Sequence, residues 1–400
     1  MNMRTARTFA FVMALFALAS GLQAATLDEV VARHIEAKGG RDAWKGVEGL
    51  KITGTYEAFS IPKPFTLIEK APGRIYFDHY QGNDHVVLGF DGTTAWMLHE
   101  GYRMDYPFRL GRADRNVAEQ ESDLATPFFD YEERGGKVEY LGREKFEGVQ
   151  GHKLKVTRQS GVEETWYLDP ETYLEFARIS TGSDYGHPTE MVTFFEDFRK
   201  VDGLVIPHHV ESEFGIRLRV MDIEKVELNP EVEDALFELQ PPAEMVPLAA
   251  LAGNWIIVVE ERGRPGMPFQ KSGLEGVITS KMGKGLVELY IEDPAEQGGI
   301  PVDVTVRFTY DRFRKLYRFS MFDDLTSLLS VMEGTEKDGR ITVDTMKSGT
   351  SWTAFGRTRH ERISVFDVTP DAFQMERETS TDGGESWYVS GKLAFTRKVK

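Results

Sequence analysis

The 400-residue sequence predicts a mainly β protein with two consecutive antiparallel β-domains. Three observations lead to this fold class. From Val47 onward, apolar and polar residues alternate with the period of two that is typical of half-buried strands. The clearest helical pattern stands alone near the N-terminus. The proline pair Pro241–Pro242, which neither a helix nor a central strand accommodates, separates two strand-rich stretches.

The first 24 residues have the pattern of a secretory signal peptide. Arg4 and Arg7 precede an apolar run from Phe9 to Leu22, which is short for a membrane span, and small residues follow. We expect cleavage after Ala24. The alternative is a retained N-terminal anchor helix.

The composition narrows the class of protein. The net charge is −16, and cleavage would remove two arginines and no acidic residue, so nucleic acid and anionic membrane surfaces should repel the mature chain. The chain has no cysteine, which excludes disulfides, thiol chemistry and lipid attachment at a cysteine. No later segment reaches the length of a transmembrane helix. We therefore expect an exported, soluble, periplasmic protein.

Residues 25–240 form the first predicted domain, which opens with a helix. In "TLDEVVARHIEAKGG", Thr26 and Glu29 form a capping box, apolar residues recur at helical spacing, and Gly39 ends the helix. His34 is expected to be a boundary residue of this helix rather than a metal ligand.

Strands follow the helix, about ten of them between Val47 and Leu228. "HKLKVT" alternates apolar and polar residues, and "TWYLDPETYLEFARI" predicts two strands joined by a turn at Asp169–Thr172. Residues 111–129 interrupt this pattern as a long loop with a weak helix.

Residues 241–250 form the predicted linker and residues 251–400 the second domain. "VDVTVRFTYD" is the cleanest alternation in the chain, and it places Val302, Val304, Val306, Phe308 and Tyr310 on one face. Further strands with almost no helical pattern indicate a barrel or a sandwich.

Several motifs of the first domain occur in the order known from the periplasmic lipoprotein-sorting carriers. They are the opening helix with Gly39–Gly40, "GLKITGTYE", "APGRIYF", "GFDGTTAWML", "WYLDPETYLEFARI", "FFEDFRKVDGLVIPHHVE" and "VELNPEVEDALFEL". In this order the domain resembles the LolA/LolB-like group. The resemblance implies a half-open, strongly curved antiparallel β-barrel with helices over its apolar concave side. It also implies acyl-chain binding without enzymatic activity.

The second domain carries "AGNW" near its start and "STDGGESW…FTRK" at its end. These motifs resemble lipocalin-like barrels, particularly an uncharacterised exported family. The resemblance implies that Trp255 packs across the closed end of the barrel under the guanidinium of Arg397. Both roles are structural.

The adjacent histidines of "GLVIPHHVE" raise the question of a metal or catalytic site. Neighbouring residues of a strand point to opposite faces, so His208 and His209 cannot hold one metal ion together, and zinc needs at least three convergent ligands. Pro207 is typical of a strand start. We therefore interpret the pair as residues of an ordinary strand.

No catalytic constellation stands out from the sequence. HExxH, GxSxG, the phosphate-binding GxxxxGK[ST] and calcium-loop spacings are absent. "STDGGESW" matches a box of sialidase propellers, but a single copy favours a hairpin turn whose glycines adopt positive φ. The many acidic residues make chance carboxylate pairs inevitable, so the sequence cannot support a glycosidase dyad. We predict no catalytic residue, no metal site, no cofactor and no enzymatic activity.

The leading functional hypothesis is a periplasmic carrier or sensor that binds a lipid, a lipoprotein acyl chain or another hydrophobic molecule in the first domain. The first alternative is an envelope interaction module that docks a protein partner without a small ligand. A hydrolase is the third alternative.

Aromatic residues make up 12% of the chain and concentrate in the first domain, where an incompletely filled curved sheet would leave an apolar cavity. The predicted ligand-binding residues are Phe65, Leu67, Phe77, Leu88, Trp96, Phe128, Phe129, Trp166 and Phe194. We further predict that residues 111–129 form a mobile lid, with Gly111 as hinge and Pro127–Phe129 as the apolar end that closes the opening.

Overall fold

The structure, a computed structural model, describes residues 25–102, 106–184, 186–295, 300–354 and 356–398. The predicted signal peptide, residues 1–24, lies outside these ranges. Among the described residues, no helix is long and apolar enough to cross a membrane. The chain divides into two compact units, Met1–Phe65 with Asp123–Asn229 and Thr66–Ser122 with Pro230–Lys400. The predicted linker at 241–250 stays a prediction.

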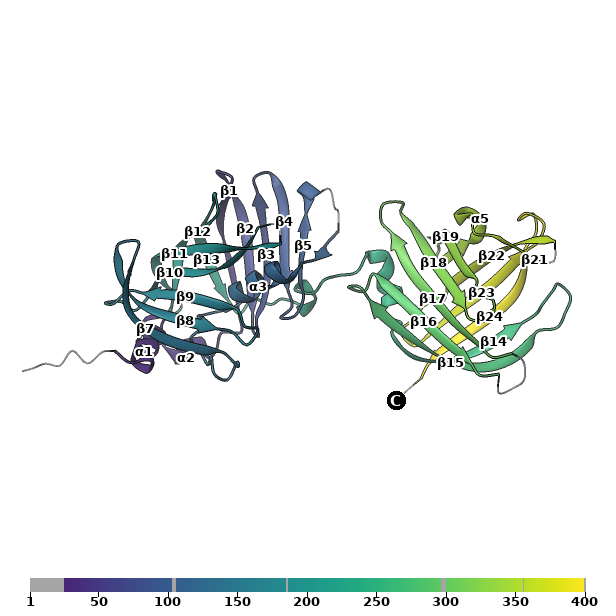
Figure 1. The fold of residues 1–400 in the computed structure, drawn as a ribbon, viewed down its shortest axis with the longest axis horizontal. Helices are drawn as coiled ribbons and strands as arrows, with labels where there is room; N and C mark the ends of the chain where they lie inside the picture. The colour runs from purple at the N-terminus through teal and green to yellow at the C-terminus, as the bar shows by residue number, and fades with distance from the viewer. Residues whose placement is uncertain (1–24, 103–105, 185, 296–299, 355, 399–400) are drawn as a thin grey trace, which may run out of the picture. The chain divides into compact units, whose positions relative to one another are not determined.

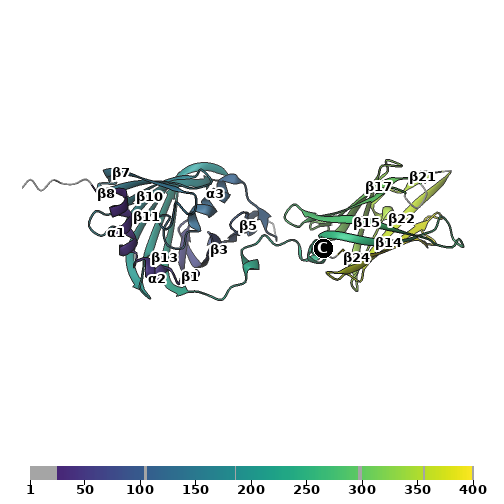
Figure 2. The same cartoon turned by 90° about the horizontal axis from the view of Figure 1, so that it is seen from below.

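The described chain is mainly β, as the sequence predicts, and its strands form a large curved antiparallel sheet and a closed barrel (Figure 1, Figure 2). The hydrogen-bonded order of the curved sheet is β6-β5-β4-β3-β2-β1-β13-β12-β11-β10-β9-β8-β7. Its strands are β1 (Gly49–Ala58), β2 (Ile61–Lys70), β3 (Arg74–Gln81), β4 (Asp84–Phe90), β5 (Ala95–His99), β6 (Phe108–Arg109), β7 (Lys137–Phe146), β8 (Val149–Thr157), β9 (Glu163–Leu168), β10 (Glu175–Asp184), β11 (His187–Val201), β12 (Leu204–Phe214) and β13 (Arg217–Leu228).

The barrel follows from residue 253 onward. Its strands are β14 (Gly253–Glu261), β15 (Gln270–Lys281), β16 (Leu286–Asp293), β17 (Val302–Asp311), β18 (Leu316–Asp323), β19 (Leu329–Lys337), β20 (Arg340–Asp344), β22 (Arg357–Phe366), β23 (Ala372–Ser380) and β24 (Tyr388–Arg397), and the short β21 (Trp352–Ala354) pairs with β22. The helices within the described residues are α1 (Leu27–Ala37), α2 (Arg41–Trp44), η1 (Glu100–Tyr102), α3 (Arg112–Glu121), η2 (Asp234–Leu236), η3 (Ala243–Met245), α4 (Val246–Ala249) and α5 (Thr345–Ser348).

Helix α1 begins at the predicted capping box. The Thr26 hydroxyl accepts from the Glu29 amide at 3.3 Å, and the Glu29 carboxylate accepts from the Thr26 amide at 3.0 Å. The apolar stripe of α1 is buried, which confirms the helical periodicity of the sequence. His34 differs from the prediction: it is fully buried rather than a boundary residue, because it lies on the same face as this stripe.

The end of α1 depends on a glycine. Gly39 has a φ of +112°, and a Cβ at this position would lie 2.3 Å from the carbonyl oxygen of Gly203. The tight approach places the helix end directly against the β11–β12 turn, where the amide of Val205 donates to the Lys38 carbonyl at 3.0 Å. A side chain at residue 39 would prevent this contact.

The two adjacent histidines lie in β12, as predicted, and face opposite sides of the sheet. His208 is buried, and His209 lies beside Asp222 (2.7 Å) and Glu211 (3.1 Å). The prediction for Pro207 is wrong, because β12 begins at Leu204. A proline is tolerated inside this strand because β12 pairs with β13 only from His209 onward. On the side of β13, Pro207 therefore has no ladder hydrogen bond to lose.

Closure of the second sheet settles the choice between barrel and sandwich. Within the described residues, ten strands form a ring, because β20 pairs with β22 through Ile341↔Val365 and Val343↔Ile363. Buried aliphatic and aromatic side chains fill its interior, among them Leu289, Phe319 and Phe395. The predicted alternation of residues 302–310 is observed in β17, where Val306 and Phe308 point into this core.

The predicted pair packs together where β14 begins and β24 ends. The Arg397 guanidinium lies 4.6 Å from the centre of the fully buried Trp255 ring and donates to the carbonyls of Ala252 (2.9 Å) and Ala250 (3.0 Å). The indole nitrogen of Trp255 donates to the Leu251 carbonyl at 2.8 Å. The expected cation–π packing is therefore confirmed.

The "STDGGESW" segment is the turn of the β23–β24 hairpin, as predicted. Gly383 and Gly384 have φ angles of +76° and +88°. The Asp382 carboxylate accepts from the Ser386 amide and the Ser380 hydroxyl, and the Ser386 contacts followed by the Ser380 contact lower the pKa of Asp382. These contacts belong to the turn itself.

Candidate functional site

A layer of aromatic rings covers one face of β9–β11 and is named here the aromatic layer (Phe128, Trp166 and Phe195). The Trp166 ring is stacked on Phe195 with centroids 5.8 Å apart and meets Phe128 edge-on at 5.7 Å. The Arg178 guanidinium lies 5.4 Å from the centre of the Trp166 ring. Strand register produces this layer, because Trp166 pairs with Arg178, and Phe195 is two residues beyond the next partner, Thr193.

Helix α1 and residues 123–134, named here the cover segment, lie over this layer. Phe128 of the cover segment is completely buried between the α1 ring of His34, at 5.0 Å, and Trp166. Together with Val30, Val31, Ile35 and strand residues of β7 to β9, Phe128 forms one hydrophobic core cluster. The cover segment therefore completes an apolar core with a side chain from a loop.

Charged groups hold the first end of the cover segment on the sheet. Asp123 accepts from Arg134 at 2.6 Å and from Arg158 at 2.7 Å, and Arg158 donates to Glu164 at 2.9 Å. The other Glu164 oxygen accepts from the Trp166 indole at 2.7 Å. Burial alone would lower the pKa of Arg158, but Asp123 and Glu164 outweigh it and raise the pKa. Polar contacts thus connect the cover segment to the aromatic layer.

A second buried network lies under α1. Lys38, with 3% of its side chain exposed, donates to Glu175 at 2.6 Å. His34 places Nδ1 2.8 Å from the Tyr173 carbonyl and Nε2 3.1 Å from the Thr126 hydroxyl of the cover segment. Burial lowers the pKa of His34, against the raising effect of Glu175. The His34 ring thus bridges the β9–β10 turn, α1 and the cover segment.

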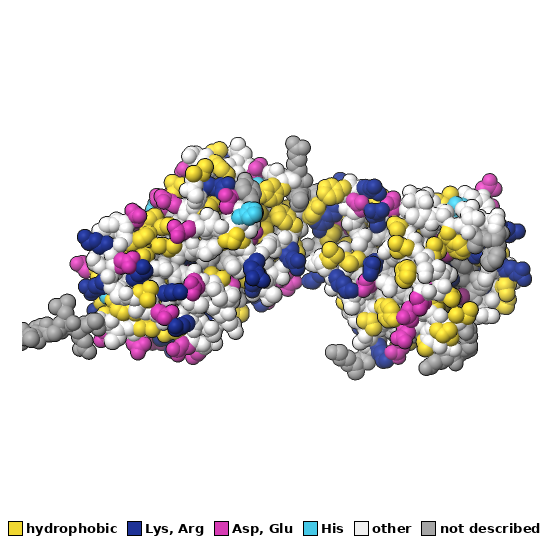
Figure 3. All heavy atoms as spheres, viewed as in Figure 1, with side chains coloured by type: hydrophobic (Ala, Val, Ile, Leu, Met, Phe, Trp, Pro, Cys, Tyr) yellow, Lys and Arg dark blue, Asp and Glu magenta, His cyan; other side chains and the backbone are white. Residues whose placement is uncertain are grey.

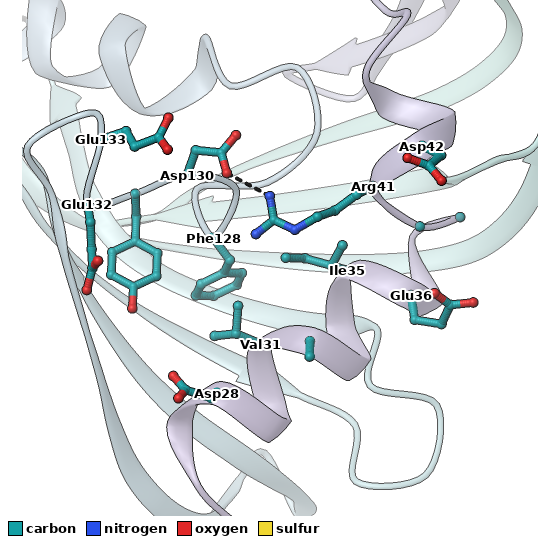
Figure 4. Close-up of a pocket in the computed structure, with 14 residues that line it drawn as sticks. Asp28, Val31, Ile35, Glu36, Arg41, Asp42, Phe128, Asp130, Glu132 and Glu133 are labelled. Atoms are coloured by element: carbon teal, nitrogen blue, oxygen red, sulfur yellow. Dashed lines mark hydrogen bonds and ion pairs between the residues drawn. The ribbon is translucent and has the colours of Figure 1, made fainter.

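A surface hollow of about 950 Å³ opens between α1, α2 and the cover segment (Figure 4). Its floor is formed by Val31, Ile35 and Phe128, which belong to the core cluster beneath. An ion pair of 2.6 Å between Arg41 of α2 and Asp130 of the cover segment crosses it. Carboxylates dominate the rest of the rim: Asp28, Glu36, Asp42, Glu132 and Glu133.

The structure brings three of the predicted ligand-binding residues together. Phe128 and Trp166 belong to the core cluster, and Phe129 packs against it. Phe194 lies on the other face of β11, opposite Ala177, with its ring 6.3 Å from that of Phe146. Its neighbour Phe195 takes the position that the sequence assigned to Phe194.

The other predicted residues lie on β2 to β5. Leu67, Phe77 and Leu88 are cross-strand neighbours and share one face, and Phe65 lies two residues before Leu67 on the same strand. Phe65 and Leu67 are buried, whereas Phe77 is half-buried and stacked on His79 at 4.1 Å.

Trp96 lies on the opposite face of these strands. It is directly across from Gly89, where a Cβ would lie 2.1 Å from the indole ring. The indole nitrogen donates to the Phe237 carbonyl at 2.8 Å. Both contacts fix Trp96 within the fold.

The polar residues of the site were not predicted from the sequence. They are His34 in its bridging role, Lys38, Asp123, Arg158, Glu164, Glu175 and Arg178. Alternation gives no signal for them, because a buried charge and an exposed charge look alike in one sequence. Among the described residues, no group of three or more His, Asp or Glu side chains is arranged to hold a metal ion.

Comparison with known proteins gives matches only among solved structures. No family model matches the chain, and no curated protein matches it. Structures similar to this chain include a LolA superfamily protein from Nitrosomonas europaea, with 14% identity over 54% of this chain and 98% of the other and a TM-score of 0.36. A DUF1329 family protein from Desulfovibrio piger has 14% identity over 53% of this chain and 98% of the other, with a TM-score of 0.35. Rv2717c from M. tuberculosis has 13% identity over 40% of this chain and all of the other, with a TM-score of 0.32.

Proposed function

We propose that the protein is a non-enzymatic periplasmic carrier or sensor, which binds a lipid-like or other hydrophobic ligand beneath α1 and the cover segment. The observation that carries the proposal is the burial of Phe128: a side chain from a loop completes the core against Trp166, directly under the hollow. A ligand chain that enters through the hollow would take the place of this ring.

The magnitudes allow such an exchange. Withdrawing a buried phenylalanine from its core costs about 2–3 kcal/mol of burial, and a ligand recovers about 0.8 kcal/mol for each methylene group that it buries. About four methylene groups therefore offset the displacement of Phe128. The half-exposed Arg41–Asp130 pair adds little resistance, because exposed ion pairs contribute about 0–1 kcal/mol.

The polar groups of the site support binding rather than catalysis. Lys38 pairs with Glu175, and Arg158 lies between Asp123 and Glu164, so each of these two cations already has a carboxylate partner inside the fold. These contacts hold α1 and the cover segment against the sheet, as expected for elements that cover a binding site.

Binding of a fluorescent fatty-acyl probe, combined with native mass spectrometry of the protein purified from periplasm, tests the proposal. Phe128→Ala should change the probe affinity several-fold, because it alters the floor of the hollow. Phe194→Ala is the matched control, since it removes the same side chain from the opposite face and should leave the affinity unchanged.

Two outcomes would reject a lipid carrier. One is purification without bound lipid together with no binding of fatty acids or lipopeptides. The other is equal probe binding by wild type and both variants. If the probe fails to bind while a single envelope protein co-purifies, the interaction-module alternative replaces the carrier.

A further inference from the structure

The barrel contains a cavity of about 340 Å³ toward the strand ends opposite the Trp255–Arg397 pair. Its walls are apolar side chains from neighbouring strands, among them Val259, Leu274, Ile291, Val304, Met321 and Leu393. The volume lies at the lower end of the range of small-molecule sites. The cavity therefore has room for one short hydrophobic body.

Charged residues replace apolar ones at the mouth of this cavity. The inward-facing positions continue from Val259 to Glu261 in β14 and from Ile291 to Asp293 in β16. The same step of two residues leads from Met321 to Asp323 in β18 and from Met375 to Arg377 in β23. Arg377 donates to Glu261 at 2.8 Å, so the cation at the mouth already has a carboxylate partner.

A buried carboxylate lies beside this mouth on β22. Glu361 is 9% exposed, and it occupies the inward face of β22 two residues before Ile363, which lines the cavity. Its Oε2 atom is buried and has no hydrogen-bond partner among the described residues. Burial raises the pKa of Glu361, Arg377 and Arg359 act against this, and Asp323 adds to it.

A second unsatisfied polar atom faces the same interior. Ser330 of β19 is fully buried and pairs across the ladder with Met321, a cavity residue. Its hydroxyl oxygen also has no hydrogen-bond partner in the described part of the chain. Buried polar atoms are rarely left unsatisfied in folded proteins.

We propose that the barrel cavity is a second binding site, which takes a small molecule with an apolar body and a cationic nitrogen head. The apolar walls match the body, and the ammonium hydrogens match the unsatisfied oxygens of Glu361 and Ser330. The acidic mouth of Glu261, Asp293 and Asp323 selects a positive charge. A carboxylate head would meet these anions and would have to displace Glu261 from Arg377.

This inference is independent of the proposed function, which concerns the aromatic layer. Three probes with one chain length separate the head groups: decylamine, 1-decanol and decanoate, each titrated into the full-length protein by calorimetry at neutral pH. Decylamine should bind about tenfold or more tightly than 1-decanol, because charge-assisted hydrogen bonds are the strong ones, and decanoate should bind most weakly.

Glu361→Gln tests the role of the buried carboxylate with almost no change in shape. It should lower the affinity for decylamine about tenfold and leave that for 1-decanol unchanged. Glu275→Gln is the matched control, because Glu275 is exposed on the barrel and pairs with Lys398 at 2.7 Å. It should leave both affinities as they are.

Phe128→Ala separates the two sites, since it alters the aromatic layer only. Decylamine binding should be the same in this variant as in wild type. Equal binding of amine and alcohol, stronger binding of decanoate, or amine binding that falls in Phe128→Ala but not in Glu361→Gln would each overturn the proposal. Unchanged melting curves show that a loss of binding is not a loss of fold.

Discussion

At the scale of single residues, we expect substitutions of buried charges to change the free energy of unfolding most. Lys38 and Glu175 are nearly inaccessible and lie 2.6 Å apart. Removing one member of a buried pair leaves the other charge uncompensated, whereas replacing both removes the problem along with the attraction.

Lys38→Met should therefore lower the free energy of unfolding by about 3–5 kcal/mol. The double variant Lys38→Met/Glu175→Gln should lose clearly less. Urea denaturation followed by tryptophan fluorescence measures both values. A double variant as unstable as the single one would mean that packing, and not charge, dominates at this position.

Glu361 gives a pH dependence of the opposite kind to an ordinary surface carboxylate. Its pKa is raised on folding, chiefly by burial, from a usual value of 4.5. Such a group stabilises the fold below its unfolded pKa, and this contribution is lost as the pH rises through the folded pKa.

Melting temperatures of wild type and Glu361→Gln should therefore diverge in favour of the variant as the pH rises from acidic to neutral. A difference of about 2–4 °C corresponds to about 1 kcal/mol for a domain of about 150–250 residues. Parallel melting curves at all pH values would show that Arg377 and Arg359 fully offset the burial of this carboxylate.

The aromatic residues show how far one sequence predicts a site. Phe128, Phe129 and Trp166 were predicted and lie together. "VTFFEDF" offers Phe194 and Phe195 on opposite faces of one strand, and the composition of the strand does not decide which face is covered. That choice depends on the register with β10, which is a property of the folded sheet.

At the scale of elements, the helix end at Gly39 is fixed by backbone contact. Gly39 and Gly203 both have positive φ, but only at Gly39 would a Cβ meet a backbone atom, at 2.3 Å. Gly39→Ala should destabilise the protein by several kcal/mol more than Gly203→Ala, because it adds a clash to the φ strain of about 1–3 kcal/mol that both share. Chemical denaturation compares the two directly, and equal losses would mean that α1 moves freely away from β12.

The cover segment is the element whose mobility can be tested. We predicted a lid at 111–129; residues 112–121 form α3, and the contacts that hold the loop begin at Asp123. Asp123→Asn weakens two contacts, so the amides of residues 123–134 should exchange hydrogen faster than in wild type. A bound acyl probe should slow the exchange in wild type. Equal exchange with and without the probe would leave this segment a fixed part of the core.

Elements were predicted best where a local signal exists. The capping box, the Asp169–Thr172 turn, the glycines of the β23–β24 hairpin and the alternation in β17 are all encoded within a few residues. The start of β12 was not, because Pro207 is acceptable inside a strand only where the neighbouring ladder has not begun.

At the scale of the whole molecule, alternation predicted the fold class, whereas closure of the second sheet was expected only from the resemblance to lipocalin-like barrels. Barrel and sandwich have the same alternation, and the pairing of β20 with β22 that distinguishes them joins residues with no local signature. The strand order of the curved sheet also depends on pairing between distant residues. β1 lies between its sequence neighbour β2 and the last strand, β13.

The pairing of β1 with β13 has a consequence for the way in which the chain becomes a protein. Leu50 lies opposite Leu228, so β1 has no partner on that side until nearly all of the first sheet has been synthesised. Contacts of such long range slow folding and leave the early strand exposed to binding by chaperones. Chains arrested before residue 217, where β13 begins, should remain protease-sensitive, and chains extended past residue 229 should become resistant. The last strand of the sheet, β13, thus completes the pairing of the first one, β1.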